Sequence, residues 1–210
     1  MKIIFGTTSN TKIEDVHRII EEEALDLEAL TMTDIGWDRG EIEENGLTLS
    51  ENSLIKANAI LAFCRDHNIT YPIITDDSGL FVDALNGEPG IYTARYADDE
   101  LAKDPSLPKY QGVYKLLRNM EGIDDRKAAY HCCVTVMGPD GDYYQEYGET
   151  KGVIAREIMG DLTKPYLYSV FMAEGTDVAF NRLDEEQKRD TYRRSTLRRI
   201  LKKGNNLLNK

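Results

Sequence analysis

The sequence predicts an α/β fold, because extended apolar runs alternate with segments that have the periodicity of amphipathic helices. Lys2–Phe5 reads as a first strand, and Ile13, Val16 and Ile19 then recur at the spacing of one helix face. Ile73–Ile74 reads as the end of a buried strand. In open α/β sheets, ligands bind beyond the carboxyl ends of the strands, so polar residues that follow a strand are the first candidates for a site.

Further segments continue this alternation. The next elements that we expect are a strand at Asp26–Leu30 and a helix with Leu54, Ala57 and Leu61 on one face. The later elements that we expect are an exposed connection at Asp98–Pro108, a helix carrying Val113, Leu116, Leu117 and Met120, a strand at Ala129–Met137, a turn at Pro139–Gly141, a strand at Tyr143–Tyr147, a separate strand that opens with Gly148, and a basic helix that buries Leu197, Ile200 and Leu201.

The composition is that of a globular protein with one large domain or one domain with two lobes. Of 210 residues, 41% are hydrophobic and 30% are charged, and no apolar run has the length of a membrane span. The first apolar piece is too short for a signal peptide, so we expect a cytoplasmic protein without a membrane partner. A net charge of −11 argues against binding of nucleic acid polymers but leaves a nucleotide substrate open. Cys64, Cys132 and Cys133 lack metal-ligand spacing and are expected as buried free thiols.

A hydroxyl-rich turn, Gly6–Lys12, leads from the first strand into the first helix. Free backbone N–H groups and the helix dipole favour an anion at such a helix start, and Lys12 adds a positive charge. The turn lacks the glycines of a P-loop, so an ordinary Ser or Asn helix cap is the alternative interpretation.

An acidic loop at Asp38–Gly46 precedes Thr48–Glu51, which has the pattern of a helix capping box. A capped helix can hold Glu43 and Glu44 in place. Fixed carboxylates suit Mg²⁺, which takes one or two protein oxygens and leaves its other positions to water and phosphates. Lys56 lies within two turns of the same helix start and is either a phosphate contact or a solvent lysine.

Two adjacent aspartates, Asp76 and Asp77, follow the apolar pair at Ile73–Ile74, and Ser78 and Gly79 come next. This order predicts a turn at the carboxyl end of a strand. The two carboxylates are expected to point in different directions, so that one binds a metal ion while the other acts as a base or supports the strand end. An isolated stretch of this kind is more often a simple turn.

The basic helix near the C-terminus offers Lys188, Arg193 and Arg194 close to its start, where a phosphate could lie, and we expect most of its other basic residues to be solvated. The anion-binding turn, the acidic loop, the paired aspartates and the basic helix together suit hydrolysis of a phosphate anhydride. Carboxylates hold Mg²⁺ and activate water, and Lys or Arg side chains neutralise the leaving phosphates.

Four motifs follow one another along the chain: Thr8–Asn10, Glu43–Thr48, Glu51–Ala57 and Asp76–Tyr96. In order and spacing they resemble the HAM1-like inosine triphosphate pyrophosphatase family, which removes non-canonical purine nucleotides. The resemblance implies two lobes around a long mixed, twisted β-sheet, with an active-site cleft between them, in a single two-lobed domain over residues 1–210. It also implies a homodimer and Mg²⁺-dependent hydrolysis of a nucleoside triphosphate to the monophosphate and pyrophosphate.

The same match implies a role for each site residue. Asp77 is implied as the general base beside Asp76, and Glu43 or Glu44 joins Asp77 in holding the metal ion. The residues that we assign to the triphosphate are Thr8, Ser9, Asn10, Lys12, Lys56, Ser78, Lys188, Arg193 and Arg194.

The N-terminal turn is one residue shorter than the family's usual Thr-x-Asn-x-x-Lys, so Lys12 approaches the site by a different path. Two further segments depart from the family's pattern. Pro165–Ser169 stands where the family has Phe-Gly-Tyr-Asp-Pro, and Tyr192–Arg194 stands where it has Ser-His-Arg. Polar groups that read the base produce strong discrimination, so these departures leave the base and the sugar open. For Tyr166, Tyr168 and Tyr192, core packing is the default expectation and stacking on a base is the alternative.

The leading hypothesis is therefore a Mg²⁺-dependent nucleoside triphosphate pyrophosphatase that acts on a non-canonical purine nucleotide. One alternative is a nucleotide-binding or regulatory protein without turnover, which would bind nucleotide tightly and release no product. Another is a phosphatase of a different phosphorylated small molecule, which would release orthophosphate instead of pyrophosphate.

Overall fold

The computed structural model describes residues 1–208 as two compact units, each assembled from separate segments of the chain. The first unit contains Met1–Asp77, Cys132–Gly148 and the chain from Tyr192 onward. The second unit contains Ser78–His131 and Glu149–Thr191.

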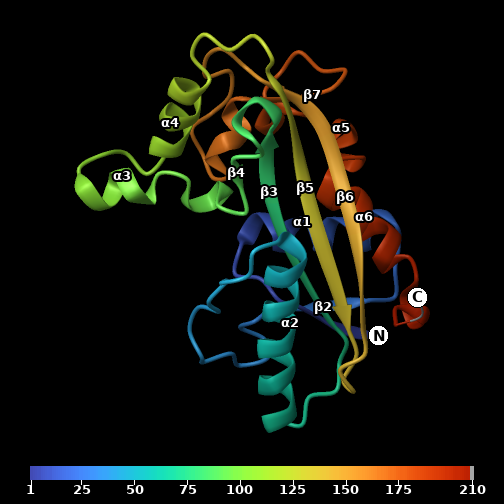
Figure 1. Ribbon diagram of the computed structural model, residues 1–210. Helices are drawn as coiled ribbons and strands as arrows, with labels where there is room; N and C mark the ends of the chain where they lie inside the picture. Colours follow the sequence, from blue (N-terminus) through green and yellow to red (C-terminus); the bar gives the residue numbers. More distant parts are fainter. Residues whose placement is uncertain (209–210) are drawn as a thin grey trace. The chain divides into compact units, whose positions relative to one another are not determined.

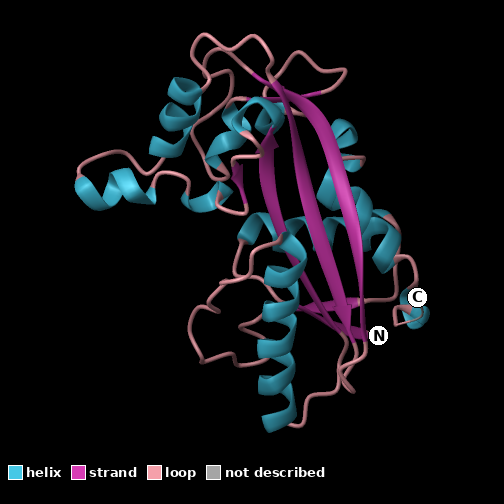
Figure 2. Cartoon of the chain, in the orientation of Figure 1, coloured by secondary structure: helices cyan, strands magenta, loops and turns pink. Residues whose placement is uncertain are grey.

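The strands form a mixed sheet, as the fold class predicted (Figures 1 and 2). The strands are β1 (Lys2–Phe5), β2 (Glu28–Leu30), β3 (Ile73–Val82), β4 (Pro89–Gly90), β5 (Lys127–Met137), β6 (Tyr143–Ile154) and β7 (Phe171–Ala173). Their hydrogen-bonded order is β2-β1-β3-β5-β6-β7, and β4 pairs with β3 outside this path. β1 runs parallel to β2 and β3, whereas β4 is antiparallel to β3 and β7 is antiparallel to β6.

Within the first unit, helices cover both faces of the sheet. The helices of the chain are α1 (Asn10–Glu22), α2 (Leu49–Asp66), α3 (Asp98–Lys103), α4 (Gln111–Asn119), α5 (Glu185–Arg189) and α6 (Tyr192–Leu201). The chain passes from β1 to β2 through α1 and returns across β1 to β3 through α2, so right-handed crossovers place the two helices on opposite faces (Figure 1). α6 packs against α1 through the ion pairs described below.

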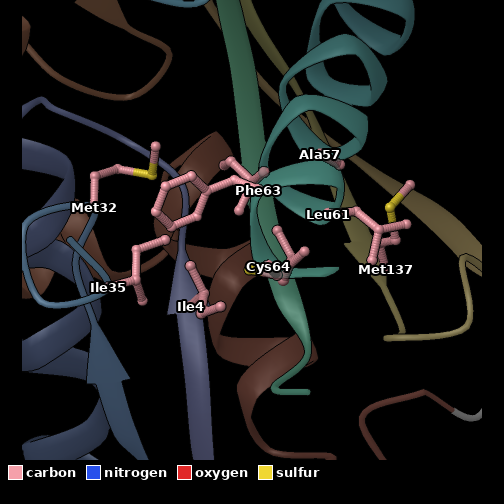
Figure 3. Packing of buried hydrophobic residues seen from close by; sticks show 10 residues of the cluster. Ile4, Met32, Ile35, Ala57, Leu61, Phe63, Cys64 and Met137 are labelled. Carbon is pink, nitrogen blue, oxygen red and sulfur yellow. The ribbon is translucent and has the colours of Figure 1, made fainter. Parts of the chain in front are cut away.

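The core of the first unit lies between α2 and the sheet. The predicted stripe of α2 is confirmed, because Ala57 and Leu61 are buried there together with Phe63. Figure 3 shows Met32 beside the Phe63 ring, and Met137 of β5 beside Leu61. The predicted apolar face of α6 is also confirmed, since its three residues Leu197, Ile200 and Leu201 are fully buried.

Aromatic side chains form much of the core of the second unit. Tyr168 packs edge-on to Tyr130 with ring centroids 5.0 Å apart, and Phe180 lies 4.7 Å from Tyr168. Tyr168 is therefore a core residue, as expected. Tyr192 of the first unit is likewise buried.

The strand that carries the two aspartates does not end at them. We predicted a turn at Ser78 and Gly79, but β3 continues through both residues to Val82. The glycine serves a close contact and not a turn, because a Cβ at Gly79 would lie 2.2 Å from the carbonyl oxygen of Gly90 in the antiparallel strand β4. Gly79 therefore allows β4 to approach β3.

The expected break at Gly148 is wrong for a similar reason. Tyr143–Tyr147 and the segment after it form one strand, β6. A Cβ at Gly148 would lie 2.2 Å from the carbonyl oxygen of Tyr192, so the glycine lets α6 approach the strand without interrupting it.

The expected exposed connection at Asp98–Pro108 contains the helix α3. Its first turn carries three acidic residues, which the helix dipole favours, and Lys115 of α4 holds Asp99 at 2.6 Å. These local charges explain a helix in a segment without an apolar stripe.

The cysteines agree with the expectation of free thiols, since Cys64, Cys132 and Cys133 are all buried and unbridged. Within residues 1–208, no helix combines the length and the apolar character that a membrane crossing requires.

Candidate active site

Asp76 and Asp77 are consecutive residues of β3, so their side chains point to opposite faces of the sheet. Asp76 faces the helices α1 and α6, and Asp77 faces α2. We call these two sides, with the side chains that line them, the α1–α6 face and the α2 face. All of the contacts described for the two faces lie within the first unit.

On the α1–α6 face, Asp76 is completely buried and forms an ion pair with Lys12. Lys12 Nζ lies 2.7 Å from Asp76 Oδ2. Burial by itself raises the pKa of the Asp76 carboxyl, but Lys12, Arg193 and Lys56 together outweigh it, so the pKa lies below its ordinary value. Asp76 is therefore held as a carboxylate.

The first turn of α1 has no side-chain cap. Ser9 occupies the N-cap position, but its side chain makes no capping hydrogen bond, so the alternative of an ordinary side-chain cap is wrong. Burial lowers the pKa of Lys12, and the positive charges of Lys56 and Arg193 lower it further against the opposing effect of Asp76. Positive charge thus accumulates at a helix start that already favours anions.

Arg193 and Arg194 reach the same face from the first turn of α6, and both are buried. Arg193 donates to Asp15 Oδ2 from Nε at 3.1 Å and from Nη2 at 2.5 Å. Arg194 Nε donates to Asp15 Oδ1 at 2.6 Å. We expected most of the other basic residues of this helix to be solvated, but Arg198 is buried too, and it pairs at 2.8 Å with Glu22 of α1 and with the C-cap residue Glu23.

On the α2 face, Asn52 and Lys56 hold Asp77 from one side of α2. Asn52 Nδ2 donates to Asp77 Oδ2 at 3.1 Å. Lys56 Nζ lies 3.7 Å from Asp77 Oδ1 and 3.1 Å from Glu44 Oε2. Lys56 is thus not a solvent lysine, and its ammonium group lies between two carboxylates.

The acidic loop is fixed to the start of α2, as the capping pattern predicted. Thr48 Oγ1 accepts a hydrogen bond from the Glu51 amide at 3.1 Å. In a capping box the Glu51 side chain would accept from the amide of the N-cap residue Thr48. Here Glu51 Oε2 accepts instead from the amide of the preceding residue, Leu47, at 2.6 Å. Asn52 Oδ1 accepts from the Gly46 amide at 2.8 Å, so one side chain ties both the loop and Asp77 to the helix.

The Asp77 carboxyl differs from its neighbour in its proton affinity. Burial, the largest influence, raises the pKa of Asp77; Lys56 opposes this and Glu44 reinforces it, and the net pKa lies above the ordinary value. Two adjacent carboxyls with pKa values displaced in opposite directions are typical of sites that divide roles between acid or base and charge support.

Comparison with known proteins identifies the family of this chain. Residues 3–203 match the model of the Ham1 family. The chain belongs to the Ham1 family. The resemblance of the sequence motifs is thereby confirmed.

Relatives and solved structures of the Ham1 type cover most of this chain. A dITP/XTP pyrophosphatase of Listeria monocytogenes is 37% identical over 161 residues, which are 76% of this chain and 72% of the relative. A dITP/XTP pyrophosphatase of Bacillus licheniformis is 32% identical and covers 95% of each chain. The Staphylococcus aureus Ham1 protein has a TM-score of 0.76 at 29% identity, over 96% of this chain and 98% of that one.

Most of the predicted site residues of this Ham1 protein fall in the first unit. Glu44 forms an ion pair with Lys56 there, whereas Glu43 is exposed and forms no side-chain hydrogen bond or ion pair within residues 1–208. In that same range, no group of three or more His, Cys, Asp or Glu side chains is arranged as a metal cluster. Ser78 and Lys188 belong to the second unit, where Lys188 pairs with Glu185 at 3.2 Å, and their contact with a triphosphate stays a prediction.

Two residues that the sequence did not single out are Asn52 and Asp15. Asn52 precedes Lys56 by one helical turn, and Asp15 follows Lys12 by three residues, so each shares a helix face with a predicted site lysine. That spacing is the signal in the sequence that could have identified them.

Proposed function

We propose that this Ham1 protein hydrolyses a nucleoside triphosphate to the monophosphate and pyrophosphate, with a non-canonical purine nucleotide such as dITP or XTP as its substrate. The observation that carries the proposal is the geometry around Asp77: Asn52 Nδ2 donates to Asp77 Oδ2 at 3.1 Å, and Lys56 Nζ lies 3.7 Å from Asp77 Oδ1. A carboxylate that is fixed in this way is a suitable base for water. The names of the relatives support the class of substrate.

In the proposed reaction, water attacks the α-phosphorus and gives its proton to Asp77. The bond between the α-phosphorus and the oxygen that bridges to the β-phosphorus breaks, and this oxygen leaves with pyrophosphate. Lys12, Arg193 and Arg194 stabilise the negative charge that develops on the leaving group. Thr8, Ser9 and Asn10 are the proposed contacts of the phosphates at the start of α1, which lacks a side-chain cap.

We propose Mg²⁺ as the metal ion, with Glu44 and Asp77 as its protein ligands. The two carboxylates already converge on one cation, since Lys56 Nζ lies 3.1 Å from Glu44 Oε2 and 3.7 Å from Asp77 Oδ1. Two carboxylates are sufficient for this ion, whose other positions go to water and phosphate oxygens. Bound Mg²⁺ supplies positive charge to the phosphate oxygens of the substrate.

We also propose that this protein works in the cytoplasm as a homodimer. In this proposal each chain forms a single two-lobed domain over residues 1–210. The motif resemblance of the sequence supports this setting. Light scattering of the purified protein at micromolar concentration tests the dimer, and a monomeric mass would contradict it.

A nucleotide panel tests the proposed activity. ITP, XTP, dITP, ATP and GTP are incubated with the protein and Mg²⁺, and pyrophosphate and orthophosphate are measured separately. We expect pyrophosphate, released faster from the non-canonical purine nucleotides than from ATP or GTP. Orthophosphate as the first product, or tight binding without any product, would contradict the proposal.

A further inference from the structure

The two arginines that begin α6 share one carboxylate on the neighbouring helix α1. Asp15 binds Arg193 through Oδ2 and Arg194 through Oδ1. Both Arg193 Nε and Arg193 Nη2 donate to the same oxygen, and a guanidinium group is planar and rigid. Asp15 thereby sets the direction in which each guanidinium group points.

These arginines lie where helix dipoles disfavour positive charge. Arg193 and Arg194 are in the first turn of α6, and the Lys12 side chain starts from the first turn of α1. The N-terminal end of a helix stabilises negative groups and not cations. Two helix starts that both carry buried or half-buried cations are therefore arranged for an anion.

The other end of the same helix pair provides a comparison. There, Arg198 of α6 and Lys202, which directly follows α6, pair with Glu22 of α1 and with its C-cap residue Glu23, at distances of 2.6 to 2.8 Å. Those contacts lie at the C-terminal ends of both helices, whereas Lys12, Arg193 and Arg194 lie in the first turns. Ion pairing at the α1–α6 interface thus has one end near the proposed phosphate site and one end away from it.

We propose that Asp15 is a positioning residue for the nucleotide: it orients Arg193 and Arg194 toward the phosphate groups that Lys12 binds. The proposal rests on the proposed function. Asp15 does not touch the substrate, and it acts by holding the two arginines beside the Lys12–Asp76 pair. Without the Asp15 carboxylate, neither guanidinium group is held in this orientation, so substrate binding weakens.

The test compares substitutions at the two ends of the helix pair. Asp15→Asn and Glu22→Gln each remove one carboxylate that pairs with an arginine of α6, and pyrophosphate release is measured against nucleotide concentration. We expect Asp15→Asn to raise KM about tenfold, as for the loss of a charge-assisted contact, with a smaller change in kcat. Glu22→Gln is expected to leave KM unchanged.

A second matched pair keeps the test decisive where Asp15→Asn does not fold. Asp15→Glu and Glu22→Asp each keep the charge and move the carboxylate by one methylene. We expect Asp15→Glu to raise KM several-fold above the wild-type value, and Glu22→Asp to leave it unchanged. Where Asp15→Asn can also be measured, the KM of Asp15→Glu should lie between those of the wild type and Asp15→Asn. An unchanged KM in the Asp15 variants, or an equal rise in the Glu22 variants, would overturn the proposal.

The wild-type protein separates this result from failure of the proposed function. A wild type that releases no pyrophosphate from any nucleotide of the panel contradicts the function. A wild type that does so, with Asp15 variants of normal KM, contradicts only the positioning role.

Discussion

The α1–α6 face and the α2 face displace the pKa values of two chemically identical side chains in opposite directions. Asp76 is fully buried against Lys12, and the charges around it lower its pKa. Asp77 is also largely withdrawn from solvent, and this burial is the main reason that its pKa is raised; Glu44, which shares Lys56 with it, raises the pKa further. One strand thus carries two carboxyls whose pKa values are displaced in opposite directions.

The difference teaches that the neighbouring charges, and not the aspartates themselves, assign the roles. Burial raises the pKa of both carboxyls. The positive charges of Lys12, Arg193 and Lys56 outweigh it at Asp76, whereas at Asp77 Glu44 opposes the charges of Lys56 and Lys12. We infer that Asp76 stabilises the fold around the phosphate site and that Asp77 carries the chemistry. Substitutions at the two positions should therefore separate stability from turnover.

The largest expected effect is on turnover at Asp77. Asp77→Asn keeps an acceptor for Asn52 but removes the base, so kcat should fall by about 10²- to 10⁴-fold. The pKa of Asp77 is higher in the folded than in the unfolded chain, so its stabilising contribution is present below the unfolded pKa and is lost as the pH rises through the folded one. The free energy of unfolding at pH 7, measured in urea, should accordingly be no lower than that of the wild type. Wild-type turnover by this variant would remove Asp77 from the mechanism.

The largest expected effect on stability is at Asp76. Asp76→Asn leaves the half-buried Lys12 without its carboxylate, and breaking a buried ion pair in this way costs about 3–5 kcal/mol. The pKa of Asp76 is lower in the folded chain, so its contribution is present above the unfolded pKa and is lost as the pH falls through the folded one. Urea unfolding at several pH values should show the difference from the wild type shrinking in acid. A constant difference across that range would contradict this explanation.

A smaller effect on turnover is expected at Asn52. Asn52→Ala removes the hydrogen bond that orients Asp77, and we expect kcat to fall about tenfold as the base becomes less well placed. Asn58→Ala, at an exposed position of the same helix, is the matched control and should have wild-type kcat. Equal losses in both variants would indicate damage to α2 instead of to the site.

The smallest expected effect concerns the metal ion. Glu44→Gln should raise the Mg²⁺ concentration needed for half-maximal activity several-fold, because one of two proposed carboxylate ligands is neutralised. Glu43→Gln serves as the control and should leave that concentration unchanged, since Glu43 is exposed. A raised Mg²⁺ requirement in Glu43→Gln, with an unchanged one in Glu44→Gln, would make Glu43 the metal ligand instead of Glu44.

The sequence predicted the elements of this fold better than their ends. Apolar spacing located α1, α2, α4 and α6, and the capped start of α2 was visible in Thr48–Glu51. Glycine in β3 and β6 was misread as a break, because close approach of Gly90 and of Tyr192 is a tertiary contact that no local pattern contains. Local sequence patterns therefore located the helices and strands but did not show that β3 and β6 continue past their glycines.

The candidate site was predictable in its residue types and not in its pairings. Asp76, Asp77, Lys12 and Lys56 could be singled out as charged residues in special local patterns. The contact of Asp15 with Arg193 joins residues 178 positions apart, and local periodicity carries no information over that distance. The two faces became distinguishable only when the sheet placed a different helix on each side of β3.

The most direct test of the two-face account is a titration of both carboxyls. Carbon-13 NMR of the metal-free protein, with the two signals assigned through Asp76→Asn and Asp77→Asn, gives each pKa separately. The account predicts a pKa below 3.8 for Asp76 and above 3.8 for Asp77. Shifts in the same direction, or in the reverse order, would contradict it.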